Sequence, residues 1–151
     1  GRMRLAKVLD TCAVTTVTVA PEQSLAEAAR AMHQAGAMAI LVKDGDLLQG
    51  FLTAEDVLIA LVSASEIDRA WNGPVRSALG KELPVVTSEE KIAEVVETMA
   101  AAGVQSLPVT AGGATLVISL CRLLQTQINS LHTEVDHLQT YIDALHDAPN
   151  D

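Results

Sequence analysis

The stretch VTVAPEQSLAEAARAM, residues 17–32, decides the fold because the chain repeats its pattern. Shifted by 67 residues without a gap, it falls on residues 84–99, PVVTSEEKIAEVVETM, with valine, glutamate, alanine and methionine in matching places. The same shift brings Gly36 onto Gly103. The chain is therefore a tandem duplication of one supersecondary unit.

Each copy predicts the order strand, helix, strand, strand, helix. In the first copy, residues 15–20 alternate like a strand, and residues 24–37 carry apolar side chains at helical spacing. Two short strands follow at 38–42 and 47–53, and a second helix at 54–63. The second copy repeats this order, which predicts an α+β fold.

Capping residues mark the ends of the first helix in each copy. Ser24 with Glu27 has the spacing of a capping box, and Thr87 with Glu90 repeats that spacing in the second copy. The glycines at 36 and 103 suit the left-handed conformation just past a helix. The two copies therefore agree on where this helix begins and ends.

The duplication also sets the domain boundaries that we expect. They are a first unit at 1–64, a linker at 65–73, a second unit at 74–125, a C-terminal helix at 121–147 and a tail at 148–151. The C-terminal helix continues the last helix of the second unit.

Composition excludes several classes of function. The net charge is −9, and the chain has one Phe, one Tyr and one Trp. Proteins that bind nucleic-acid polymers need basic stripes and stacking aromatics, so we expect no nucleic-acid partner. No apolar run is long enough to span a bilayer and no signal-peptide pattern is present, so we expect no membrane association and a cytoplasmic location.

The sequence carries no signal of catalysis or of metal binding. There is no Gly-rich phosphate loop with a lysine, no metal-ligand cluster and no nucleophile with its base. Cys12 and Cys121 are too few and too far apart for a zinc site or a disulfide framework. We therefore expect no enzyme, no catalytic residue, no metal and no required cofactor.

The repeat, together with VTVAPEQSLAEAARAM, GFLTAEDVL and GVQSLPV, resembles the cystathionine-beta-synthase (CBS) domain. CBS domains occur as tandem pairs called Bateman modules, and the resemblance covers roughly residues 5–128. It implies two β-α-β-β-α units that pack pseudo-symmetrically and leave two clefts. In many members these clefts bind adenosine-containing ligands.

The resemblance implies one well-formed cleft. In the family, each cleft takes a Thr-x-x-Asp from one unit, here Thr53 and Asp56, and Asp56 would accept the ribose hydroxyls. The opposite wall would come from the second unit: Leu83, Pro84, Val85, Val104, Gln105, Ser106 and Pro108. The open alternative is that Thr53 and Asp56 only cap the helix that begins near Ala54.

The second cleft looks degenerate. Carried over without a gap, it has Leu120 and Leu123 in place of the threonine and the aspartate. Opposite them, residues 37–39 precede Leu41, where the family usually has proline. We therefore expect a closed second cleft and at most one ligand per chain.

The residues between Thr53 and Asp56 bear on the charge of the ligand. They are Ala54 and Glu55, where phosphate-binding members often carry basic residues, and a carboxylate near a phosphate weakens binding. Arg122 and Lys81 are candidate phosphate contacts. The candidate ligands are AMP, ADP, ATP, adenosine and S-adenosylmethionine, with a polyphosphate the least favoured.

The C-terminal helix carries an unbroken heptad seam. Its members are Leu124, Ile128, Leu131, Val135, Leu138, Ile142 and Leu145. β-Branched residues at the a positions and leucine at the d positions favour two parallel strands. We expect a homodimer through a parallel coiled coil and through the faces of the CBS units; the alternative is a helix folded back on its own domain.

Two functions remain open. The first is a regulatory signal-transduction module that binds an adenosine-type nucleotide or S-adenosylmethionine in one cleft and relays binding through the coil to a downstream domain or partner. The second is a structural dimerisation or protein-interaction module with both clefts closed.

Overall fold

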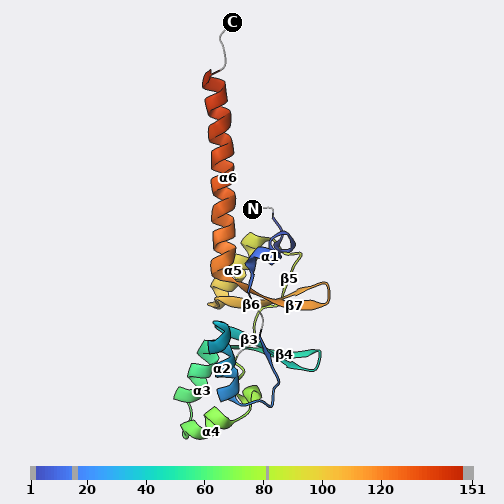
Figure 1. Cartoon of the computed structure of the whole chain (residues 1–151), viewed down its shortest axis with the longest axis vertical. Coiled ribbons are helices and arrows are strands. Elements are labelled where there is room, and N and C mark those ends of the chain that lie inside the picture. The colour runs from blue at the N-terminus through green and yellow to red at the C-terminus, as the bar shows by residue number, and fades with distance from the viewer. Residues whose placement is uncertain (1–2, 15–16, 81, 148–151) are drawn as a thin grey trace.

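The computed structural model describes residues 3–14, 17–80 and 82–147. The described chain forms two α+β units stacked along one long axis, and the C-terminal helix extends away from them (Figure 1). The expected fold class and the long C-terminal helix are thus confirmed.

The first unit has a three-stranded sheet in the order β2-β3-β4. Its strands are β2 (Thr18–Val19), β3 (Ala39–Asp44) and β4 (Leu47–Thr53), with β2 parallel and β4 antiparallel to β3. Helices α2 (Leu25–Ala35) and α3 (Ala54–Val62) complete it. Val19, Leu25, Ala28 and Leu52 belong to its buried core.

The second unit has a four-stranded sheet in the order β1-β7-β6-β5. The strands are β1 (Ala13–Val14), β5 (Val86–Thr87), β6 (Ser106–Ala111) and β7 (Ala114–Ser119). Helices α5 (Ile92–Ala102) and α6 (Leu120–Asp147) accompany them, and α6 has 28 residues.

The first helix of each unit ends as the sequence predicts and begins in two different ways. Gly36 and Gly103 close α2 and α5 in the left-handed conformation, with φ of 63° and 67°. Ser24 Oγ accepts from the Glu27 backbone N–H at 3.1 Å and caps α2. The Glu27 carboxylate accepts instead from Gln23 Nε2, so the reciprocal half of the box is used elsewhere.

The prediction that Thr87 and Glu90 cap the second of these helices is wrong. Helix α5 begins at Ile92 with Lys91 as its N-cap, and Lys91 makes no side-chain cap. Glu90 Oε2 accepts from the Thr87 N–H at 2.7 Å, which closes the turn before the helix. The Ala20 N–H donates to Gln23 in the same way in the first unit.

The two units exchange the segments that precede them. The N-terminal elements η1 (Leu5–Lys7) and α1 (Leu9–Cys12) pack in the core of the second unit, where Leu5 and Cys12 are fully buried. Backbone hydrogen bonds fix this crossing, from Leu5 N to Glu90 O and from Ile92 N to Met3 O. The sequence repeat places these residues at the start of the first unit, whereas their packing places them with the second.

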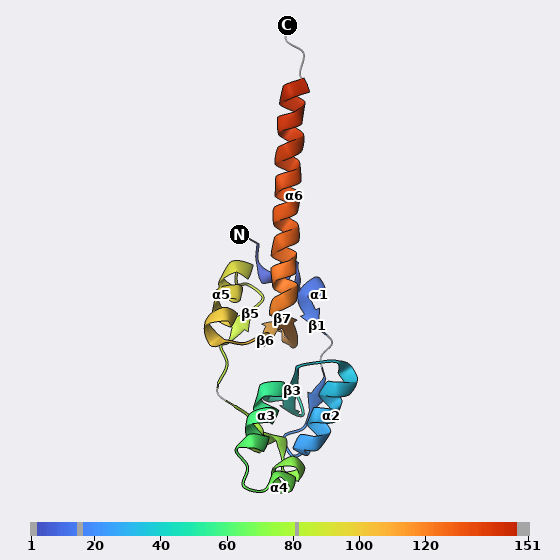
Figure 2. The same cartoon turned by 90° about the vertical axis from the view of Figure 1, so that its left-hand side faces the viewer.

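The segment that precedes the second unit packs, in turn, on the first unit. Helix α4 (Ile67–Asn72) and the 3-10 helix η2 (Val75–Ala78) pack on the first unit, with Val75 fully buried and Trp71 against the same core. Val75 N donates to Gln23 O and Leu25 N donates to Gly73 O. Figure 2 shows α4 beside α2 and α3, at the end of the molecule opposite α6.

A third buried cluster joins the two units. Ala39, Leu41 and Phe51 of the first sheet contact Val117 of the second, and Val14 and Leu83 pack at its edge. Burial of this apolar contact stabilises the packing of the two sheets against each other.

One irregularity separates the two copies. In the first hairpin Val42 pairs with Gly50 and Lys43 with Leu48, so Gln49 is left over as a β-bulge. The second hairpin is regular from Ser106–Ser119 to Ala111–Ala114. Beyond the bulge, the first copy is therefore one residue longer than the second.

Candidate functional site: a pocket between the two units

A pocket of about 1200 Å³ runs from the junction of the units along α3 to the linker. One face of α3 lines it, because Glu55, Ile59 and Ser63 follow one another at a spacing of four residues. Residues 103–106 of the second unit line the opposite side. Ligand pockets commonly measure about 300–1,000 Å³, so this one has room for a nucleotide-sized molecule.

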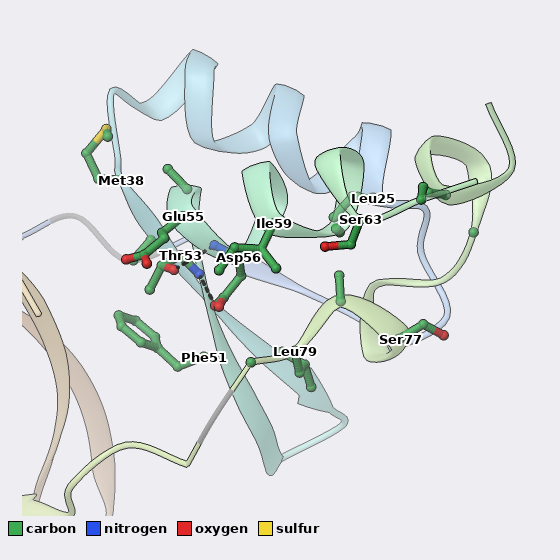
Figure 3. A pocket seen from close by; sticks show the side chains of 18 of the residues that line it. Leu25, Met38, Phe51, Thr53, Glu55, Asp56, Ile59, Ser63, Ser77 and Leu79 are labelled. Carbon is green, nitrogen blue, oxygen red and sulfur yellow. Dashed lines mark hydrogen bonds between the residues drawn. The ribbon is translucent and has the colours of Figure 1, made fainter. Parts of the chain in front are cut away.

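Thr53 and Asp56 lie at the start of α3 and form a complete capping box. The Thr53 N–H donates to Asp56 Oδ2 at 2.9 Å, and the Asp56 N–H donates to Thr53 Oγ1 at 3.1 Å. Figure 3 shows both bonds inside the pocket, with the Phe51 ring beside them. Thr53 and Asp56 therefore do cap α3, and Asp56 Oδ1 is left outside the box.

Gly80, which follows η2, lies close to this carboxylate. A Cβ built on Gly80 would lie 2.3 Å from Asp56 Oδ1, far inside van der Waals contact. Asp56 cannot retreat without breaking its bond to the Thr53 N–H. The position accepts glycine alone while Asp56 keeps this rotamer.

We expect Gly80→Ala to lower the free energy of unfolding by about 1–2 kcal/mol, because the displaced carboxylate loses its charged hydrogen bond. Urea unfolding measures this loss. In an Asp56→Ala background the same substitution should cost almost nothing, since the clashing oxygen is gone. An equal cost in both backgrounds would show that Gly80 serves the backbone and not Asp56.

The sequence-predicted ligand residues divide into two groups. Those that line the pocket are Thr53, Asp56, Leu83, Val104, Gln105 and Ser106. Three do not: Pro84 and Val85 precede β5, with Val85 84% exposed, and Pro108 lies within β6 opposite Val117. The ligand role of the first group remains a prediction.

The structure corrects the alignment of the second cleft. Ser106 pairs with Ser119 as Ala39 pairs with Thr53, so Ser119 takes the place of Thr53. Arg122, three residues on, takes the place of Asp56. The expectation that Leu120 and Leu123 stand there is wrong, because an ungapped shift ignores the bulge at Gln49.

Leu120 and Leu123 have a packing role instead. Leu123 is fully buried in the core of the second unit, and Leu120 packs against the same core. Leu120 N donates to Gln105 O at 2.9 Å, the bond that Ala54 N makes to Met38 O in the first unit. At the second cleft, the Ser119 hydroxyl therefore stands where Thr53 stands in the first, and the Arg122 guanidinium replaces the carboxylate of Asp56.

Arg122 and Lys81 were the candidate phosphate contacts. Arg122 Nη1 donates to the Ala13 carbonyl at 2.9 Å, and Arg122 does not line the pocket. Its backbone N–H donates to Ser119 Oγ at 3.5 Å, so Ser119 caps α6. Lys81 lies outside the described residues.

Sequence reasoning missed the linker end of the pocket. Glu66, Arg69, Gly73 and Ser77 line it there, opposite α3. The repeat could not reveal Arg69, because α4 has no counterpart among the described elements of the other copy. The spacing of Glu55, Ile59 and Ser63 was the one available signal of a longer pocket.

The heptad residues of α6 form an unpaired apolar stripe. Their side chains are 40–62% exposed in the single chain. Helix α6 leaves the second unit and does not fold back on it (Figure 2). The fold-back alternative is therefore wrong, while the coiled coil remains a prediction.

Within residues 3–14, 17–80 and 82–147, no group of three or more His, Cys, Asp or Glu side chains could hold a metal ion. No helix in this described part of the chain is long and apolar enough to cross a membrane.

The fold and the pocket define a class of protein with two α+β units and a ligand-sized space between them. Residues 13–63 match the family model of the CBS domain. This match confirms the resemblance inferred from the repeat and from GFLTAEDVL. No curated protein sequence matches the chain.

Several solved structures with this fold are described as CBS-domain proteins. A CBS-domain containing protein of Agrobacterium tumefaciens superposes with a TM-score of 0.73 at 23% identity, over 83% of this chain and 94% of its own. A protein with CBS domains from Burkholderia ambifaria, described as acting in signal transduction, gives 0.73 at 24%, over 84% and 95%. CBSX2, solved in complex with AMP, gives 0.67 at 15%, over 83% and 96%. The fold of most of the chain is therefore that of CBS-domain proteins.

Proposed function

We propose that the chain is a regulatory, non-catalytic module that binds an adenosine-type ligand in the pocket between its units. The observation that carries this proposal is the meeting of Thr53 and Asp56 with Gln105 and Ser106, from the other unit, around one open space. A ligand held there would touch both units at once. Binding would therefore favour one angle between them.

The chemistry of the lining supports a nucleoside. Asp56 Oδ1 can accept from ribose hydroxyls while Oδ2 stays in the capping box. Phe51, Ile59 and Leu83 supply apolar surface for a base. The AMP complex of CBSX2, which shares this fold, supports the same ligand class.

We propose further that the module works as a parallel homodimer. Helix α3 lines the pocket on one face and exposes Leu58 and Val62, at 60% and 74%, on another. Helix α3 and the start of α6 lie on the same side of the molecule, which faces the viewer in Figure 2. A second copy could cover both, so a ligand that moves α3 would shift the roots of the paired helices and any domain or partner on the coil.

One observation favours the alternative, a structural dimerisation or interaction module. The capping box already gives Thr53 and Asp56 a local role, so neither residue needs a ligand to explain it. Binding measurements separate the two functions.

We expect Asp56→Ala to weaken adenosine binding about ten- to a hundredfold, the scale of a lost charged hydrogen bond. Isothermal titration with adenosine, AMP, ATP and S-adenosylmethionine measures it. Asp46→Ala is the matched control, because Asp46 is exposed outside the pocket and the net charge changes equally. If neither variant nor the native chain binds any of the four, the structural alternative holds.

A further inference from the structure

The charges around the pocket oppose a phosphate. Among its described lining residues, Glu55, Asp56 and Glu66 are acidic, and Arg69 is the one cation. The chain as a whole carries a net charge of −9, so the surrounding field adds to this excess.

Glu55 stands where a phosphate would otherwise be attracted. The first turn of a helix has a positive partial charge and free N–H groups, which attract anions. In α3 this turn already holds Glu55 and Asp56. Figure 3 shows Glu55 beside Thr53, at the end of the pocket away from Ser77.

No described cation offsets Glu55. The ion pair that the structure shows between described residues joins Arg76 to Glu22, and neither of these lines the pocket. Arg69 lies on α4, at the linker end, whereas Glu55 lies on the first turn of α3 at the junction of the units.

We propose that Glu55 is a specificity-determining residue that makes the pocket select an uncharged or cationic adenosine-type ligand over a phosphorylated one. This inference rests on the proposed function and concerns the same pocket. The 5′ end of the ligand is then a hydroxyl or a positively charged group. The module would report on a nucleoside or a sulfonium compound and not on the level of nucleotide phosphates.

The test compares adenosine, AMP and S-adenosylmethionine by isothermal titration at low and at high salt. We expect AMP to bind about tenfold more weakly than adenosine at low salt. Glu55→Gln should improve AMP binding about three- to tenfold, which is the scale of one exposed charge at short range, and leave adenosine unchanged. High salt should shrink the difference.

Glu97→Gln is the matched control, because Glu97 is exposed on α5, outside the pocket, and the net charge changes equally. AMP that binds more tightly than adenosine would overturn the inference and leave the proposed function intact. If Glu55→Gln and Glu97→Gln bind AMP with equal affinity, Glu55 does not determine the specificity of the pocket. If none of the three ligands binds, the proposed function itself is refuted.

Discussion

Replacing Leu131 and Leu138 together by lysine should weaken dimerisation at least about a thousandfold, so that the chain is a monomer at micromolar concentration. Each leucine is about 60% exposed in the single chain and would be buried at a d position of the coil. A buried leucine contributes roughly 1.5–3 kcal/mol, and the double substitution removes four per dimer. Sedimentation equilibrium measures the change.

Thr133→Lys with Thr140→Lys is the matched control. Both threonines lie on the outer face of the heptad and bond only to their own helix, so the same charge is added away from the seam. A dimer that survives the leucine substitutions unchanged would mean that the CBS units, and not the coil, hold the copies together. The exposed face of α3 would then be the interface to examine.

Cys121 would report the direction of pairing in the proposed coil. It lies seven residues before Ile128, at an a position, and its side chain is exposed. In a parallel, in-register pair the two Cys121 thiols face each other and a mild oxidant should join them, whereas antiparallel pairing sets them about 40 Å apart. A non-reducing gel detects the linked dimer, and Cys121→Ser should abolish it. Cys12 is buried and does not compete.

Leu5→Ala should lower the free energy of unfolding by about 2–5 kcal/mol, a large part of the roughly 5–15 kcal/mol that holds a domain. Leu5 is fully buried among Val86, Ile92 and Leu107 of the second unit. The loss should therefore appear in that unit, although residue 5 precedes the first repeat. Chemical denaturation gives the size, and hydrogen exchange gives the place.

Leu47→Ala serves as the control for this change, because Leu47 is 65% exposed at the tip of the first hairpin. We expect it to alter stability by less than about 0.5 kcal/mol. A similarly small effect of Leu5→Ala would contradict the exchange of segments between the units.

The sequence was sufficient for the order of elements and for one side of the site. Alternation and helical spacing are local, so β4, α3 and the αL glycines could be placed from the repeat. Thr53 and Asp56 were identified as site residues through the resemblance, and the start of α3 accounts for both residue types at that spacing. Both residues lie at the start of α3, and this one position gives them their capping role and their place in the pocket.

The exchange and the bulge could not be predicted, for different reasons. Internal similarity says which segments are alike, but not which copy each segment packs against, so Leu5 and Val75 were assigned to the nearer unit. The bulge at Gln49 changes the register by one residue without disturbing either helix pattern. Because of that one residue, the ungapped shift aligns Leu123 with Asp56, whereas the strand register aligns Arg122 with it.

The crossed segments also set the order in which the chain can fold while it is being synthesised. Residues 3–12 are synthesised before their backbone partners at 88–92, and their core partner Leu123 follows later still. Leu5, Leu9 and Cys12 therefore lack their packing partners until residue 123 has been synthesised. The second unit cannot complete its core before that point, and until then these apolar side chains are open to capture by a chaperone or to aggregation.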